Sequence, residues 1–181
     1  MRIKLFLLSL LLLGSCKTAV KESPSLLDCV PQNSLAVFQL NDQNMLENAH
    51  INLPFLAEIV AIDSRIDQDI KDILPKSFPP KALLCFTPEG KSAIALSFIY
   101  KKESIDSIPK FSGEQLFYNN TAITIAQKDQ RKIYSASIEG IQIVTTSQLV
   151  LENSIRNLQN KRPGIQNHYF FDLAQISDDN A

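Results

Sequence analysis

The chain has few of the residues on which enzyme motifs depend. It contains five glycines, two histidines and no tryptophan. No G-x-S-x-G, S-x-x-K or glycine-rich phosphate loop occurs, so the common motifs for serine nucleophiles and nucleotides are absent. His50 and His168 lack the company that zinc-ligand spacing requires, and each is expected to be a surface or partly packed side chain. The sequence therefore predicts no catalytic, metal or cofactor site.

Long apolar runs and dense positive charge are also missing. The longest apolar run, Leu5–Leu13, has nine residues including Ser9, whereas a membrane-spanning helix needs about 20. Without residues 1–15 the chain has 16 basic and 19 acidic residues, a formal charge of −3. No basic patch stands out, which argues against nucleic acid as a partner.

The first 16 residues are ordered like a bacterial export signal. Arg2 and Lys4 precede the apolar run, and the stretch Leu13-Gly14-Ser15-Cys16 ends it. This order is typical of a signal peptide, and its L-G-S-C ending resembles the lipobox of bacterial lipoproteins. The resemblance implies cleavage before Cys16 and a diacylglyceryl group on its thiol, although Gly14 departs from the usual pattern. The alternative is a plain secreted protein in which Cys16 is incidental.

The anchor sets the expected organisation of the chain. The polar stretch after Cys16 lacks apolar periodicity and is expected to be a flexible tether. Lys17, rather than an aspartate, follows the anchor, and by resemblance to sorting rules in double-membrane bacteria this favours the outer membrane, on its periplasmic or surface face. The predicted segments are a signal peptide (1–15), a lipid-anchored tether (16–25), one domain (26–176) and a polar tail at a point of truncation (177–181).

Two cysteines remain once Cys16 is assigned to the anchor. Cys29 and Cys85 would meet oxidising conditions in the envelope, so a Cys29–Cys85 disulfide is one interpretation. Free cysteines are also commonly buried as small apolar residues. The sequence leaves both interpretations open, because bridging depends on a Cα separation that the sequence does not contain.

The pattern of apolar residues changes from helical to strand-like along the chain. A strand is predicted over 34–40, and helices after Asp42 and over 53–62, 64–74 and 148–160. Three hairpins are predicted, turning at Pro88–Lys91, Asn119-Asn120 and Glu139-Gly140, and a last strand over 167–173. These elements predict an α+β fold: an antiparallel β-meander sheet with helices packed on one face.

Two segments of the chain resemble each other. Residues 34–53 and 139–158 align without gaps at an offset of 105, with six identities in 20 positions. Each is a predicted strand, a capping turn and a helix. A duplicated unit and chance similarity between two strand–helix turns explain the match equally well.

Two further groups of residues are candidates for a binding site. Asp63, Asp67, Asp69 and Asp72 form an acidic group, but helical isoleucine spacing replaces the glycine turn of a calcium loop, so a solvated helix face is expected. Near the C-terminus, Tyr169 and Phe171 share one side of a predicted strand and are a candidate interface with a partner or a missing domain.

Loose similarities and missing motifs together define the expected function. The opening strand after V-P-x-x-S and the later G-I-Q-I-V-T-T-S before a helix resemble uncharacterised cell-envelope lipoprotein domains, for which no catalytic residue is carried over. The first hypothesis is a non-enzymatic binding or assembly module that contacts the membrane through Cys16 and an envelope protein partner. The alternatives are an envelope hydrolase with a site assembled from distant residues, and a lipid or small-ligand carrier.

Overall fold

The structure, a computed structural model, describes residues 24–41, 65–75, 78–91, 93–104, 113–128 and 131–160. Several sequence predictions therefore lie outside the described residues. They are the signal peptide, Cys16 and most of the tether, the helices predicted between Asp42 and Ile62, both histidines, the strand over 167–173 with Tyr169 and Phe171, and the polar tail.

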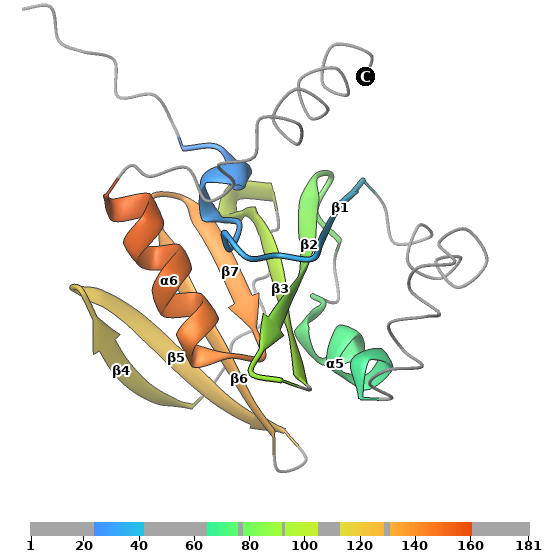
Figure 1. Ribbon diagram of the computed structural model, residues 1–181. Helices are drawn as coiled ribbons and strands as arrows, with labels where there is room; N and C mark the ends of the chain where they lie inside the picture. Colours follow the sequence, from blue (N-terminus) through green and yellow to red (C-terminus); the bar gives the residue numbers. More distant parts are fainter. Residues whose placement is uncertain are drawn as a thin grey trace, which may run out of the picture.

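Seven strands form one antiparallel sheet in the order β1-β2-β3-β7-β6-β5-β4 (Figure 1). The strands are β1 (Ala36–Leu40), β2 (Ala82–Glu89), β3 (Ala93–Lys101), β4 (Glu114–Tyr118), β5 (Thr121–Lys128), β6 (Arg131–Ile138) and β7 (Ile141–Thr145). The described helices are α5 (Ile66–Ile73) and α6 (Gln148–Gln159), with 3₁₀ turns η1 (Leu26–Cys29) and η2 (Lys102–Ser104). The predicted α+β class is confirmed.

The strand order differs from a simple meander at one place. β3 pairs with β7, through partners such as Phe98 and Val144, and β4 lies at the far edge. The reason is burial: all five residues of β7 are buried, which requires neighbours on both sides, whereas β4 has an exposed pattern suited to an edge. The chain therefore crosses from β3 to the opposite edge before the last four strands run back.

All three predicted hairpin turns are confirmed. The turns between β2 and β3, β4 and β5, and β6 and β7 each contain residues with positive φ: Gly90, Asn119, Asn120, Glu139 and Gly140. Glycine adopts this conformation without steric cost and asparagine tolerates it. The consecutive positive φ angles at 119–120 and 139–140 match the two-residue turns that suit twisted hairpins.

The two described helices lie on opposite faces of the sheet, so the prediction of helices on one face is wrong (Figure 1). Neighbouring strand residues point to opposite faces, and here both faces are apolar. The α5-side core consists of Leu40, Ile66, Ile73, Ala82, Leu84, Phe86, Leu96, Phe98, Tyr100, Ile133 and Val144. The α6-side core consists of Leu26, Cys29, Val30, Leu83, Cys85, Ile99, Ile123, Ala136, Ile141, Ile143, Leu151, Ile155 and Leu158.

Helix α6 forms where the sequence predicts it. The Ser147 hydroxyl accepts a hydrogen bond from the backbone N–H of Val150 at 3.4 Å and so caps the first turn. The helix buries Leu151, Ile155 and Leu158, the predicted stripe, against β6, β7 and η1. None of the helices in the described part of the chain is long and apolar enough to cross a membrane.

The internal similarity places β1 and β7 in equivalent positions of the sequence. Their bounds differ by the same offset of 105 at both ends, 36 to 141 and 40 to 145. Equivalent positions face opposite sides, since Ala36 packs against the α5-side core and Ile141 lies in the α6-side core. The helical part of the first copy lies outside the described residues, so duplication and chance both remain compatible with the structure.

Candidate functional site

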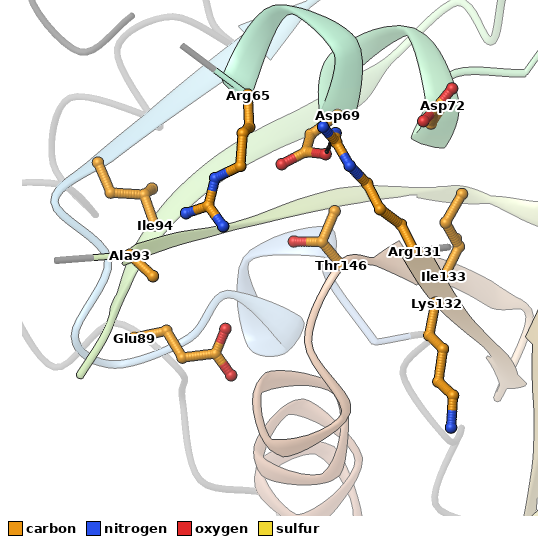
Figure 2. A pocket seen from close by; sticks show the side chains of 10 residues that line it. All are labelled: Arg65, Asp69, Asp72, Glu89, Ala93, Ile94, Arg131, Lys132, Ile133 and Thr146. Carbon is orange, nitrogen blue, oxygen red and sulfur yellow. Dashed lines mark hydrogen bonds and ion pairs between the residues drawn. The ribbon is translucent and has the colours of Figure 1, made fainter. Parts of the chain in front are cut away.

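A charged hollow of about 240 Å³ lies at one end of the sheet (Figure 2). In an antiparallel sheet, β2 and β7 end where β3 and β6 begin. This geometry brings Glu89, Ala93, Arg131 and Thr146 together, and the first turns of α5 cover them. The lining residues are Arg65, Asp69, Asp72, Glu89, Ala93, Ile94, Arg131, Lys132, Ile133 and Thr146.

An ion pair joins two walls of the hollow. The Arg131 guanidinium, at the start of β6, binds the Asp69 carboxylate on α5. Beside it, the Gln68 amide donates to the Asp72 carboxylate at 2.9 Å, one helical turn along α5. Asp72 is only 9% exposed. The acidic side of α5 is therefore partly buried against the sheet, and the prediction of a solvated face is wrong for Asp69 and Asp72, whereas Asp63 lies outside the described residues.

Hydroxyl groups fix the opposite wall. The Ser147 hydroxyl donates to the Glu89 carboxylate at 2.6 Å, and the Thr146 hydroxyl accepts from the backbone N–H of Leu96 at 3.0 Å. Because Ser147 also caps α6, these bonds connect the β2–β3 hairpin to the N-terminus of the helix. A carboxylate is favourable there, since the helix dipole places partial positive charge at this end.

Figure 2 shows how the charged side chains lie around the opening. The Arg65 guanidinium and the Glu89 carboxylate reach into the hollow from opposite sides, and Thr146 lies to one side of both. Lys132 points away, as expected from strand alternation next to Arg131 and Ile133. The hollow thus presents both signs of charge to whatever enters it.

The lining of the hollow is chemically suited to recognising charged partners. Guanidinium, carboxylate and hydroxyl groups recognise charged partners through charge-assisted hydrogen bonds. The ten lining residues include no histidine, cysteine or serine that could serve as a nucleophile with a neighbouring base. Among the residues that the structure describes, no group of three histidine, cysteine, aspartate or glutamate side chains is arranged to hold a metal ion.

Outside the acidic group on α5, the structure describes two of the candidate site residues, Cys29 and Cys85. Cys29 and Cys85 are both fully buried free thiols in the α6-side core, away from the residues that line the hollow. Cys16, Tyr169 and Phe171 lie outside the described residues.

Sequence reasoning missed the hollow. Its ion pair joins residues 62 positions apart, and no local motif marks such a partnership. The sequence offered two signals: the acidic group that includes Asp69 and Asp72, and Glu89 within the predicted turn at Pro88–Lys91. Comparisons with protein-family models, curated proteins and solved structures found no match to this chain.

Proposed function

We propose that this chain is a non-enzymatic binding or assembly module of the bacterial cell envelope, tethered to the outer membrane through lipidated Cys16. The observation that carries the binding role is the hollow, where charged groups of both signs from α5, β2 and β6 converge around Thr146. Convergent polar groups in a preformed concavity are what ligand and partner sites share.

The expected partner is a protein segment that carries both charges. A carboxylate of the partner would approach the Arg65 side, where a guanidinium gives a bidentate geometry. A cationic group would approach Glu89, whose second carboxylate oxygen is not used by the Ser147 bond. Matching charges of this kind mainly provide orientation and specificity.

Photo-crosslinking in cells tests this role. A photoreactive amino acid at position 93 lines the hollow, whereas one at position 117 is a control on the β4 edge, where Phe117 is 73% exposed and lies outside the hollow. We expect a defined envelope protein to form a crosslink with position 93. This crosslink should be lost in the variants Arg65→Gln and Glu89→Gln, and also in Cys16→Ser, which removes the anchor.

The alternatives give different results. Crosslinking from position 117 alone would place recognition on the sheet edge and reject the hollow. Crosslinking that survives Cys16→Ser would separate binding from membrane placement. Turnover of an envelope substrate by the purified chain would contradict the non-enzymatic role.

A further inference from the structure

Cys29 and Cys85 come from distant parts of the chain but share one buried layer. Cys29 ends η1, and Cys85 lies in β2 on the face that α6 and η1 cover. Both side chains have 0% exposure, and both thiols are unbonded in the structure. They are the only cysteines in the described residues.

Backbone contacts bring the segment that follows Cys29 onto the part of β2 that carries Cys85. After η1 the chain turns at once, with the Ser34 N–H donating to the Pro31 carbonyl at 3.1 Å. It then meets β2: the Leu35 N–H donates to the Phe86 carbonyl at 2.7 Å, and the hydroxyls of Ser34 and Thr87 lie 3.2 Å apart.

The same contacts fix the side on which the cysteines meet. Thr87 and Cys85 are two residues apart in a strand and so point to the same face. Cys29 therefore enters the core next to the part of β2 that carries Cys85. Burial is the main cause of the raised pKa of the Cys85 thiol, and the charge of the Cys29 thiolate adds to it, as expected of neighbours.

We propose that Cys29 and Cys85 are a disulfide site, oxidised as the chain folds in an oxidising compartment. The oxidant is the disulfide of a thiol–disulfide exchange protein, for which oxidised glutathione is the small-molecule equivalent. One cysteine thiolate attacks that disulfide to form a mixed disulfide and release one thiol. The second cysteine then displaces the other thiol, so one S–S bond forms and two electrons and two protons pass to the oxidant.

The timing of this reaction follows from burial. Thiolates are the reacting species, and burial raises the pKa of the Cys29 thiol to about 12 and that of the Cys85 thiol further in the same direction. The folded reduced chain therefore presents almost no thiolate near neutral pH. Oxidation is expected while η1 is docking, and the finished core is expected to resist both oxidation and alkylation.

The bond would connect the anchor region to the sheet. η1 follows directly after the predicted tether, and β2 lies second from one edge of the described sheet, between β1 and β3. A Cys29–Cys85 bond closes a loop that contains β1 and α5. A pulling force on the lipid anchor would then be transmitted to β2 through a covalent bond. Without this bond, the same force would act on the noncovalent contacts that hold η1 in the core.

Refolding the full chain with the Cys16→Ser substitution tests the site without interference from the third thiol. The chain is refolded from denaturant in a glutathione redox buffer, alkylated under denaturing conditions and digested with trypsin. Cleavage at lysine and arginine places Cys29 in peptide 22–65 and Cys85 in peptide 82–91. We expect these two peptides to be linked, to separate on reduction, and to be accompanied by a higher melting temperature.

Quantitative alkylation of both cysteines after oxidative refolding would overturn the proposal. Cys85→Ala controls for non-specific crosslinking, because its remaining Cys29 should be fully alkylated. The expectation that the disulfide forms in the cell rests on the proposed envelope location. It is tested separately, on the wild-type chain isolated from cells. A pair that links in the refolded chain but is reduced in cells would keep the site and reject the oxidising location.

Discussion

The two faces of the sheet solve the same packing problem with different residues. The α6 side is filled mainly by isoleucine and leucine from six elements, and the long, capped α6 covers it. The α5 side is aromatic: Phe38 packs edge-on against Phe86 with ring centroids 5.6 Å apart, and Phe98 lies 5.4 Å from Tyr100. Helix α5 covers it with only eight residues.

The charged hollow lies on the face with the shorter helix. Among the described residues, α5 is short and carries several charged side chains, and the charged hollow lies between α5 and the hairpin ends. On the α6 side, α6 and η1 pack against each other over the sheet. One face therefore contributes mainly to stability, and the other combines stability with a charged surface.

The largest expected effect is a loss of stability at high pH, to which the two faces contribute over different pH ranges. Burial raises the pKa of Cys29 and Cys85 on the α6 side and raises the pKa of Tyr100 on the α5 side to about 12. These groups hold their protons more tightly when folded, so their contribution is complete below the unfolded pKa values. It is lost as pH rises from about 9 for the thiols and about 10 for the phenol.

The expected loss is on the order of 5 kcal/mol by about pH 11, which is comparable to the whole stability of many domains. Urea unfolding of the reduced chain between pH 8 and 11 measures it. Replacing both cysteines by alanine should remove the loss that begins near pH 9, and Tyr100→Phe should remove only the later part. A free energy of unfolding that stays constant to pH 11 would show that the three groups do not remain buried and neutral.

Replacing single leucines of α6 by alanine should show how much the apolar face of this helix contributes to the free energy of unfolding. Leu151 is fully buried and Leu149, two residues earlier, is 60% exposed. Leu151→Ala is expected to lower the free energy of unfolding by about 3 kcal/mol through lost burial and an unfilled cavity. Leu149→Ala, the matched control on the same helix, should change it by less than about 0.5 kcal/mol. Equal effects at the two positions would mean that α6 does not pack as described.

Single hydroxyl groups provide the smallest test, one on each face. Tyr100 on the α5 side and Ser154 on the α6 side each bury an oxygen that has no hydrogen-bond partner among the described residues. Because an unsatisfied buried polar group is unfavourable, Tyr100→Phe and Ser154→Ala should each raise stability by about 1 kcal/mol. Thermal or urea unfolding measures the change. A loss of stability in either variant would reveal a partner for that hydroxyl outside the described residues.

The parts of the fold that were predictable depend on nearby residues. Asn119-Asn120 and Glu139-Gly140 fix hairpins by their own conformational preferences, and Ser147 with its three-residue spacing to Val150 fixes the start of α6. Each of these signals lies within a few residues of the structure that it determines. The sequence was therefore sufficient for these elements.

The faces and the site depend on distant residues and were not predictable in the same way. The pairing of β3 with β7 brings Lys101 next to Ile141, and no local pattern encodes that choice over a continuous meander. The face that a helix covers is likewise set by the whole sheet. The Arg131–Asp69 pair exists only because β6 begins beneath α5, so the hollow could be identified only after the fold was known.

The pairing of β3 with β7 also determines the order in which the molecule can be built. β3 ends about 40 residues before its second neighbour β7 begins, so an edge that is interior in the finished sheet stays open while those residues are being made. Contacts that close such long loops form late and slow the folding of β proteins. Until β7 is available, the edge of β3 that pairs with it has no strand partner, and a chaperone that covers this edge is expected to raise the yield of native protein.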